Sequence, residues 1–336
     1  VDMLAEDYPD IVLNRYRNES MYSEVIEVVC PDDQEEPFSR GKFVKRLLSL
    51  GMPPELANDI TRHVHSHLVN EQIHRISSHE LIAQTYEAVR KMGSQKYADN
   101  YLIWWDFHQS NIPLIILIGG IPGSGKSTIA TELANRLSIV RTQSTDMLRE
   151  VMRALIPRLV APSLHESSFN AGKSLFRSSM HNETDMDLLL GGYQMQSDMV
   201  SVACGAVLKR AIKERVSLIL EGVHMRPGLF NQLQKSDAVV VPVLLAVLQQ
   251  KRLKQNFRGR SSFSEKRSAK RYLDNFDRIW QLQSAILSDA DAADIEIVEN
   301  VDVDGSTTEI CRLATEFISA RYKGRVKALR KEFSGQ

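Results

Sequence analysis

The sequence predicts an α/β protein with a doubly wound parallel sheet and a small, mainly helical N-terminal domain. Two observations support this fold class. Apolar residues recur at helical spacing from residue 37 to about residue 105, and short apolar strands alternate with amphipathic helices from about residue 109. The second pattern is typical of parallel βαβ units. The 336 residues leave room for two domains, since single hydrophobic cores stop growing near roughly 250–300 residues.

Four segments follow from these changes of pattern. Residues 1–36 contain a strand-like run, EVIEVV, and the acidic turn PDDQEEP, so we expect a strand and a loop there. Residues 37–108 form the helical domain, and residues 109–322 form the α/β domain. Residues 323–336 are basic and polar, and we expect them to be a solvated tail.

The helical domain is predicted from its helix starts and its apolar spacing. The paired prolines of PPELANDITRHVHSHLVN suit a first helical turn. Ser77 and Glu80 have the spacing of a capping box at the start of the next helix. One buried stripe along the proline-led helix is expected from residues that repeat every four positions, namely Leu56, Ile60, Val64 and Leu68.

The α/β domain is expected to contain five strands: Leu114–Ile118, Ile139–Thr142, Ser217–Leu220, Val239–Leu245 and Ile295–Val298. Helices are predicted after the first strand, from about Asp146, across an insertion at residues 160–213, and from Ser264 to about Leu287. A further helix ends the domain. Capping boxes are expected at the starts of the last two helices, formed by Ser262 with Glu265 and by Ser306 with Glu309.

The composition excludes several classes of protein. Lys plus Arg and Asp plus Glu are equal at 42 each, so no overall field favours nucleic acid or a membrane surface. Cys30, Cys204 and Cys311 form no C-x-x-C pair, which argues against a disulfide framework and suits a reducing cytosol. The longest apolar runs are about half the roughly 20 residues of a membrane span. We expect a cytoplasmic protein without a membrane or nucleic-acid partner; a removed targeting segment before Val1 and a homo-oligomeric state are left open.

A glycine-rich loop carries the clearest chemistry. GIPGSGKS, residues 120–127, satisfies the P-loop pattern G-x-x-x-x-G-K-[ST] between an apolar strand and a helical pattern. Its glycines let backbone N–H groups point at phosphate oxygens, next to the positive end of a helix. We therefore predict a P-loop NTPase-type sheet that binds Mg²⁺ and ATP, with Lys126 on the terminal phosphates and Ser127 on the metal. The predicted nucleotide-binding residues are Gly120, Ile121, Pro122, Gly123, Ser124, Gly125, Lys126, Ser127 and Thr128.

Charged residues that follow the second and third strands are candidates for the acceptor side of the site. Asp146, Arg149 and Arg153 are spaced along one face of the helix that follows the second strand. Ligands of open α/β sheets bind at this carboxyl edge, where such a helix would suit a hydroxylated anion. Glu221 ends the third strand and can approach Mg²⁺ or position the attacking group, while the nearby His224 and Arg226 are expected to contact the substrate.

A basic run and a histidine pair are further features that could form sites. The basic run from Gln249 to Arg271 resembles the lid of small-molecule kinases, and we expect Arg258 and Arg260 to close over the transferred phosphoryl group. A solvated helix face and a nucleic-acid patch are its alternatives. His63 and His67 form an i, i+4 pair without a third ligand nearby, so a metal site is not expected there.

The chain resembles the 2-phosphoglycerate kinase family across roughly residues 35–320, through GGIPGSGKSTIATELANRL, TDMLREVMR, LHESSFNAGK and LILEGVHMRPG. The resemblance implies ATP-dependent phosphorylation of 2-phosphoglycerate, whose hydroxyl would attack the γ-phosphate, with His165 among the substrate-binding residues. Relatives implicated in phytic-acid metabolism make inositol or an inositol phosphate a rival acceptor. The N-terminal region is similar to an ATP-cone, but has VVCPDDQEEP where ATP-cones have a basic strand and a glycine turn. A packing domain without regulatory nucleotide is therefore an alternative.

The combined prediction is a small-molecule kinase. Asp146 would orient or deprotonate the hydroxyl of a small anionic acceptor, Arg149 and Arg153 would hold its carboxylate or phosphate, and Glu221 would organise the metal. Phosphoryl transfer of this kind depends mostly on positioning and electrostatics. Two other classes are left open: a P-loop ATPase switch that acts on a protein partner, and a polynucleotide kinase, whose binding would depend on salt.

Overall fold

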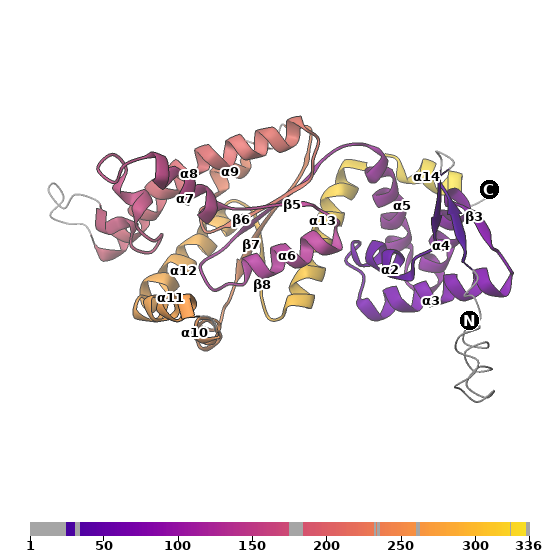
Figure 1. Cartoon of the computed structure of the whole chain (residues 1–336), viewed down its shortest axis with the longest axis horizontal. Coiled ribbons are helices and arrows are strands. Elements are labelled where there is room, and N and C mark those ends of the chain that lie inside the picture. Colours follow the sequence, from indigo (N-terminus) through magenta and orange to yellow (C-terminus); the bar gives the residue numbers. More distant parts are fainter. Residues whose placement is uncertain are drawn as a thin grey trace, which may run out of the picture. The chain divides into compact units, whose positions relative to one another are not determined.

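The computed structural model describes residues 25–30, 34–174, 184–231, 233, 236–259, 263–322 and 324–333. The chain divides into two compact units. Among the described residues, the first unit contains those up to Leu47, the segment Met52–Ile103, and those from Gly324 onward. The second unit contains Leu48–Gly51 and the described residues from Trp104 to Tyr322 (Figure 1).

The first unit contains a three-stranded sheet beside its helices. Its strands β1 (Glu27–Val29), β2 (Glu35–Pro37) and β3 (Arg75–Ser77) lie in the order β2-β1-β3, with β1 antiparallel to β2 and parallel to β3. The prediction of a loop throughout PDDQEEP is therefore wrong at β2, because the backbone of Glu35–Pro37 pairs with β1. Since β3 follows a long helix in the chain, local sequence could not reveal that β1 joins the helical domain.

The helices of the first unit follow the predicted apolar pattern. They are α2 (Arg40–Leu48), α3 (Pro54–Asn70), α4 (Ser78–Met92) and α5 (Gln95–Gln109), although Leu48 and the residues of α5 from Trp104 onward belong to the second unit. Ile60, Val64 and Leu68 of α3 are buried as predicted, whereas Leu56 is only partly buried. The capping box at the start of α4 is confirmed, because Ser77 and Glu80 each accept a hydrogen bond from the other's backbone N–H.

The C-terminal residues form a helix that packs on the first unit, so the prediction of a solvated tail is wrong for α14 (Val326–Phe333). Leu329 and Phe333 are each only 3% exposed. The Arg330 guanidinium donates to Asp99 at 2.7 Å, and the Phe333 ring stacks on His79. The basic residues of α14 therefore occupy one side of an amphipathic helix whose other side is buried.

The second unit contains a five-stranded, entirely parallel sheet in the order β5-β6-β4-β7-β8. This order confirms the predicted α/β fold class, since helices link the strands and β4 is buried at every position. Each predicted strand is present, although β5 begins two residues later than expected. Their bounds are β4 (Leu114–Gly119), β5 (Arg141–Ser144), β6 (Leu218–Gly222), β7 (Val239–Ala246) and β8 (Glu296–Glu299).

The helices of the second unit differ from the prediction in two places. The helix expected from Ser264 to Leu287 is two helices, α11 and α12, separated at Asn275. Ser306 lies inside α13 rather than at its start, and the Asp302 carboxylate accepts from the Gly305 N–H there. The capping box predicted at Ser262 lies outside the described residues. The helices are α6 (Lys126–Arg136), α7 (Thr145–Leu155), η1 (Pro162–His165), η2 (Ala171–Ser174), α8 (Asp185–Lys213), α9 (Pro227–Asn231), α10 (Gln250–Arg258), α11 (Phe263–Asp274), α12 (Phe276–Ala292) and α13 (Val303–Tyr322).

The core of the second unit fixes the sheet edge where the candidate site lies. Ile115 and Leu117 of β4 pack with apolar side chains of α8 and α12. Since all five strands are parallel, their carboxyl ends meet at one edge, where β4 leads into the P-loop and β5 into α7. Within the described residues, no helix is both long and apolar enough to cross a membrane.

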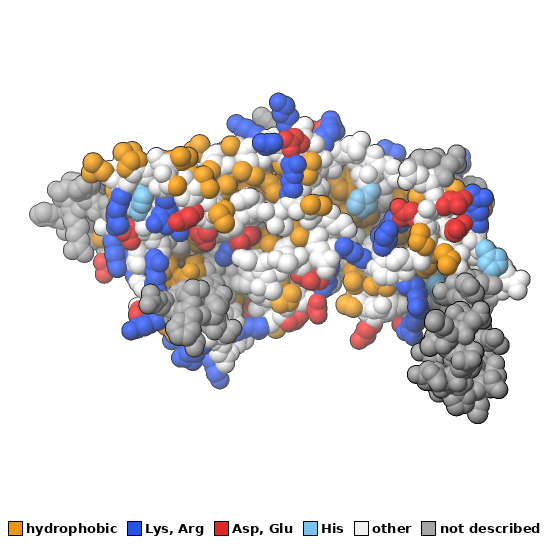
Figure 2. Space-filling view, viewed as in Figure 1, with side chains coloured by type: hydrophobic (Ala, Val, Ile, Leu, Met, Phe, Trp, Pro, Cys, Tyr) orange, Lys and Arg blue, Asp and Glu red, His pale blue; other side chains and the backbone are white. Residues whose placement is uncertain are grey.

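Helix α7 is apolar on two sides. Leu148 and Met152 pack against the core, whereas Met147, Val151 and Leu155 are 59%, 54% and 77% exposed. Figure 2 shows hydrophobic side chains along the upper left of the second unit, where α7 and α8 run in Figure 1. Exposed stripes of this kind often mark contact surfaces.

Candidate active site

The P-loop has the backbone geometry that its glycines allow. Gly123 and Gly125 have φ values of +85° and +92°, a region that residues with a side chain rarely adopt. A Cβ at Gly123 would also lie 2.4 Å from the Phe257 ring of α10. The loop therefore requires glycine at this position both for its backbone conformation and for its packing.

Two asparagines that sequence reasoning missed hold this loop. Asn256 of α10 donates to the Gly123 carbonyl at 2.9 Å, and Asn300 donates to the Ser124 carbonyl at 2.8 Å. Because the N–H of a peptide points away from its carbonyl, each tether turns an N–H group toward the other side of the loop. Asn300 directly follows β8, so its place at the carboxyl edge of the sheet was a signal that could have identified it.

Lys126, Ser127 and Glu221 converge at the start of α6. The Lys126 ammonium is buried and donates to the Ile121 carbonyl at 2.8 Å. The Ser127 hydroxyl donates to the Glu221 carboxylate at 2.9 Å. Glu221 is 8% exposed near the end of β6, directly beside β4 in the sheet. The structure therefore brings together the two residues predicted to face the metal, although 94 positions separate them in the chain.

Helix α7 presents the predicted acceptor residues Asp146 and Arg149. Ser144 caps the helix by accepting from the Asp146 N–H at 3.2 Å. Asp146 is exposed, and its carboxylate lies 3.7 Å from Arg149 Nε. Arg149 Nη1 donates to the carbonyls of Leu164 and Glu166, at 3.1 and 2.6 Å. Both residues are thus held at the carboxyl edge of the sheet, and Arg149 is anchored there by backbone.

Arg153 lies one turn further along α7. Its Nη1 donates to Glu150 of the same helix at 2.7 Å. The Nε atoms of Arg149 and Arg153 are buried and make no hydrogen bond within the described residues. Such nitrogens can donate to an anion, since a guanidinium has five N–H donors in a fixed fork.

His224 is buried behind this helix rather than exposed to a substrate. It is 1% exposed, and its Nδ1 and Nε2 lie 2.9 Å from Thr145 Oγ1 and 3.1 Å from Gln196 Oε1. Burial lowers the pKa of the imidazole to about 4, and the charges of Asp146, Arg149 and Lys126 also act on it. The prediction that His224 contacts the substrate is wrong for direct contact, because both ring nitrogens are already engaged.

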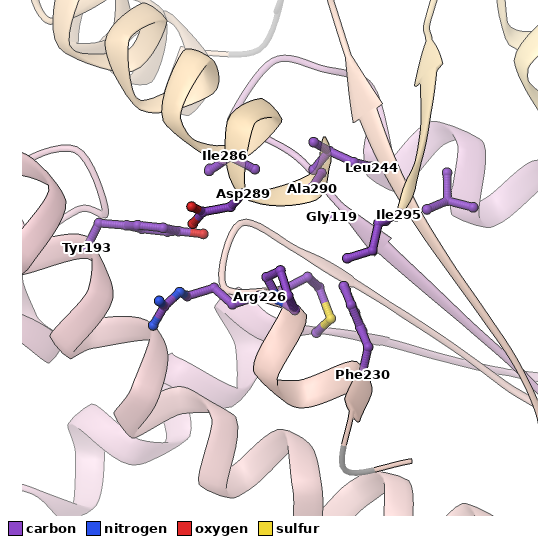
Figure 3. Close-up of a pocket in the computed structure, with 12 residues that line it drawn as sticks. Gly119, Tyr193, Arg226, Phe230, Leu244, Ile286, Asp289, Ala290 and Ile295 are labelled. Atoms are coloured by element: carbon purple, nitrogen blue, oxygen red, sulfur yellow. The ribbon is translucent and has the colours of Figure 1, made fainter. Parts of the chain in front are cut away.

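Two other predicted substrate residues are directed elsewhere. His165 Nε2 lies 2.9 Å from the Ile156 carbonyl, in a contact that holds the turn after α7. Arg226 pairs with Asp198 of α8 at 2.8 Å. Figure 3 shows the Arg226 guanidinium pointing away from Phe230 and toward α8, beside a pocket between α8, α9 and α12. Partners outside their own elements decide these orientations, which residue spacing could not indicate.

The predicted lid residues are only partly described. Arg258 is exposed at the last position of α10, and Arg260 lies outside the described residues. His63 and His67 are exposed on α3, and no cluster of three or more His, Cys, Asp or Glu side chains suited to a metal occurs among the described residues.

A parallel sheet with a P-loop after its central strand, and a carboxylate from the adjacent strand on the P-loop serine, defines a P-loop nucleotide-dependent enzyme. The chain is 35% identical over 274 residues to a 2-phosphoglycerate kinase of Pyrococcus furiosus, covering 82% of this chain and 88% of that protein. It is 34% identical over 282 residues to one of Methanothermobacter thermautotrophicus, covering 84% and 91%. The chain belongs to the 2-phosphoglycerate kinase family.

Two further comparisons concern parts of the chain. The ATP cone domain model matches residues 26–110, so β1 and the helices up to α5 lie within one module. A gluconokinase structure from Sinorhizobium meliloti 1021 shares 16% identity and covers 63% of this chain and 95% of its own, with a TM-score of 0.35. The fold assignment therefore depends on strand order and the P-loop, not on that overlap. The chain is an ATP-dependent kinase that phosphorylates a hydroxyl group of a small molecule.

Proposed function

We propose that this kinase transfers the γ-phosphate of ATP to the hydroxyl of 2-phosphoglycerate. The observation that carries the proposal is that the Nε side of the Arg149 guanidinium lies beside the Asp146 carboxylate. Arg149 uses Nη1 on two carbonyls, whereas its Nε, on the edge that it shares with Nη2, makes no hydrogen bond within the described residues. This Nε–Nη2 edge binds a carboxylate or phosphate through two parallel N–H···O bonds. Since Asp146 lies 3.7 Å from Nε, an anion bound there would have its hydroxyl close to a carboxylate.

The proposed roles follow from these positions. The backbone of Gly120–Thr128 and the Lys126 ammonium hold the phosphates, while Arg149 and Arg153 hold the acceptor's anionic group. Asp146 accepts a hydrogen bond from the acceptor hydroxyl and then its proton. Arg258 and Arg260 would neutralise charge from the lid. The protein thus contributes chiefly alignment and electrostatic stabilisation of the transferring group.

Mg²⁺ is the divalent ion that this donor set fits. Ser127 offers a hydroxyl and Glu221 a carboxylate at one place, and both are hard oxygen donors of the kind that Mg²⁺ takes with nucleotide phosphates and water. When bound, the ion would neutralise charge on the phosphates. Ser127 and Glu221 would hold it, directly or through water.

The experiment incubates the protein with Mg·ATP and a panel of phosphoglycerates, inositol and inositol phosphates, followed by phosphorus NMR. A new phosphomonoester signal from 2-phosphoglycerate supports the proposal. Product from inositol phosphates alone would contradict it in favour of the rival acceptor. Hydrolysis of ATP at the same rate with and without every acceptor would instead favour a P-loop ATPase switch. Arg149→Lys is the matched variant, since it keeps the charge but loses the planar fork.

A further inference from the structure

A buried chain of hydrogen bonds joins three elements behind the candidate acceptor site. It runs from Thr145 at the start of α7, through His224 after β6, to Gln196 on α8. All three side chains are at most 1% exposed. Gln196 Nε2 then donates to the carbonyls of Ser163 and Glu166, the latter at 2.9 Å. A fully satisfied network in the protein interior holds its members in one arrangement.

The partners of Gln196 fix the tautomer of His224. A carbonyl can only accept, so the two backbone carbonyls take both N–H groups of the Gln196 amide, and its Oε1 must accept. His224 Nε2 therefore carries the ring proton and donates to Gln196 Oε1. Nδ1 is then the acceptor, and the Thr145 hydroxyl donates to it. The low pKa of this imidazole, about 4, keeps this neutral form in place near neutral pH.

Each ring nitrogen leads to a different residue of the acceptor site. Thr145 immediately precedes Asp146 in the first turn of α7. The Glu166 carbonyl, which accepts from Gln196, also accepts from Arg149 Nη1 at 2.6 Å. The end of β6 lies so close to Thr145 that a Cβ at Gly222 would be 1.7 Å from its hydroxyl oxygen. Small changes at His224 would therefore reach both Asp146 and Arg149.

We infer, on the basis of the proposed function, that His224 is a positioning residue with two separable roles. Its Nδ1 places Asp146 through Thr145, and its Nε2 places Arg149 through Gln196 and the Glu166 carbonyl. The histidine never touches the acceptor. The residue determines instead where the proton-accepting carboxylate and the anion-binding guanidinium stand relative to each other.

Two conservative variants separate these roles. In His224→Asn, the amide oxygen can replace Nδ1 as the acceptor for Thr145, while the donor to Gln196 is lost. In His224→Gln, the amide N–H can replace Nε2 as the donor to Gln196, while the acceptor for Thr145 is lost. We expect the Asn variant to raise KM for 2-phosphoglycerate about 10-fold with little change in kcat, since only the Arg149 branch is broken. We expect the Gln variant to lower kcat by about 10- to 100-fold with little change in that KM.

KM for ATP should stay at the wild-type value in both variants. The control is Tyr193→Phe, which removes a different buried bond between α8 and the loop after β6, from the Tyr193 hydroxyl to the Val223 carbonyl at 2.8 Å. This control should lower the melting temperature without splitting kcat from KM. Equal kinetic effects in the Asn and Gln variants, or effects that follow the melting temperature as in the control, would overturn the inference.

A second measurement needs no turnover. Nitrogen-15 NMR of the wild-type protein should show the His224 ring as the Nε2–H tautomer, assigned by loss of its signals in His224→Asn. The Arg149 Nε–H signal, assigned with Arg149→Lys, should move in the Asn variant and keep its position in the Gln variant. An Nδ1–H tautomer, or an Arg149 signal that moves equally in both, would contradict the inference. If the wild-type protein phosphorylates no phosphoglycerate, the proposed function fails, while these NMR results still decide the role of His224.

Discussion

Glu221→Gln should separate activity from stability. The carboxylate is 8% exposed and accepts a hydrogen bond from Ser127 at 2.9 Å. Glutamine keeps the volume, and its amide oxygen can accept the same bond, so only the negative charge is lost. Because burying a charge costs several kcal/mol that its partners only partly offset, we expect the free energy of unfolding to stay within about 1 kcal/mol of wild type or to rise. The rate should fall by roughly 10²–10³, the usual cost of losing one preorganised electrostatic group.

The assay measures kcat with 2-phosphoglycerate at several Mg²⁺ concentrations, alongside urea unfolding of the same preparation. The control is Glu309→Gln, whose carboxylate pairs with Arg312 within α13; it should leave kcat unchanged. Wild-type kcat in Glu221→Gln would refute the metal role of Glu221. A loss of activity that tracks a loss of more than about 3 kcal/mol in stability would show that the carboxylate is structural instead.

The remaining predictions concern the donor loop, acid stability and the C-terminal helix. Lys126→Ala and Asp146→Ala should each abolish transfer while circular dichroism and melting temperature stay near wild type; full activity in either would exclude that residue's role. Because burial lowers the pKa of His224 from 6.5 to about 4, the unfolded chain binds this proton more readily between these values, so stability falls as pH falls from 6.5 toward 4, by about 3 kcal/mol. His224→Asn should lack this part of the acid sensitivity in urea unfolding at pH 7 and pH 4.5, and identical slopes would contradict it. Phe333→Ala should destabilise the chain by about 3 kcal/mol, because it leaves a buried cavity. Arg330→Ala, which breaks a partly exposed ion pair, should cost about 1 kcal/mol or less. Calorimetry of both variants measures these losses of stability, and a larger loss in Arg330→Ala would contradict the prediction.

The strands of the second unit could be predicted because their signal is local. Runs such as Leu114–Ile118 and Val239–Leu245 are apolar over the length of a buried strand, and both are β-strands of the central sheet. The docking of α14 was missed although Leu329 and Phe333 are spaced for one helix face. Its basic residues dominate the composition, and the partner that fixes it, Asp99, lies 231 positions earlier.

The candidate site could likewise be predicted only where its residues lie close together in the sequence. The P-loop segment could be predicted, because one continuous stretch supplies its glycines, its lysine and its serine, whereas Asn256 and Asn300, which hold it from other elements, were missed. The orientation of His224 could not, because it depends on Gln196, 28 positions earlier on α8. Arg226 is directed to α8 by Asp198, which is equally distant in the chain. Residue type and spacing indicated which side chains were near the sheet edge, but not which of them face inward.

The P-loop and the acceptor residues are held by separate sets of contacts, so acceptor specificity can change without a change in ATP binding. The P-loop is tethered by Asn256 and Asn300, whereas the acceptor residues depend on Gln196 and the turns that its amide holds. The two sets of contacts come from different elements, so a substitution on α8 can shift Arg149 without disturbing the phosphate loop. Gln196→Glu would test this separation, because a carboxylate cannot donate to the Ser163 and Glu166 carbonyls. It should weaken the binding of 2-phosphoglycerate while the affinity for ATP is retained, and an equal loss of both would show that the two halves of the site are coupled.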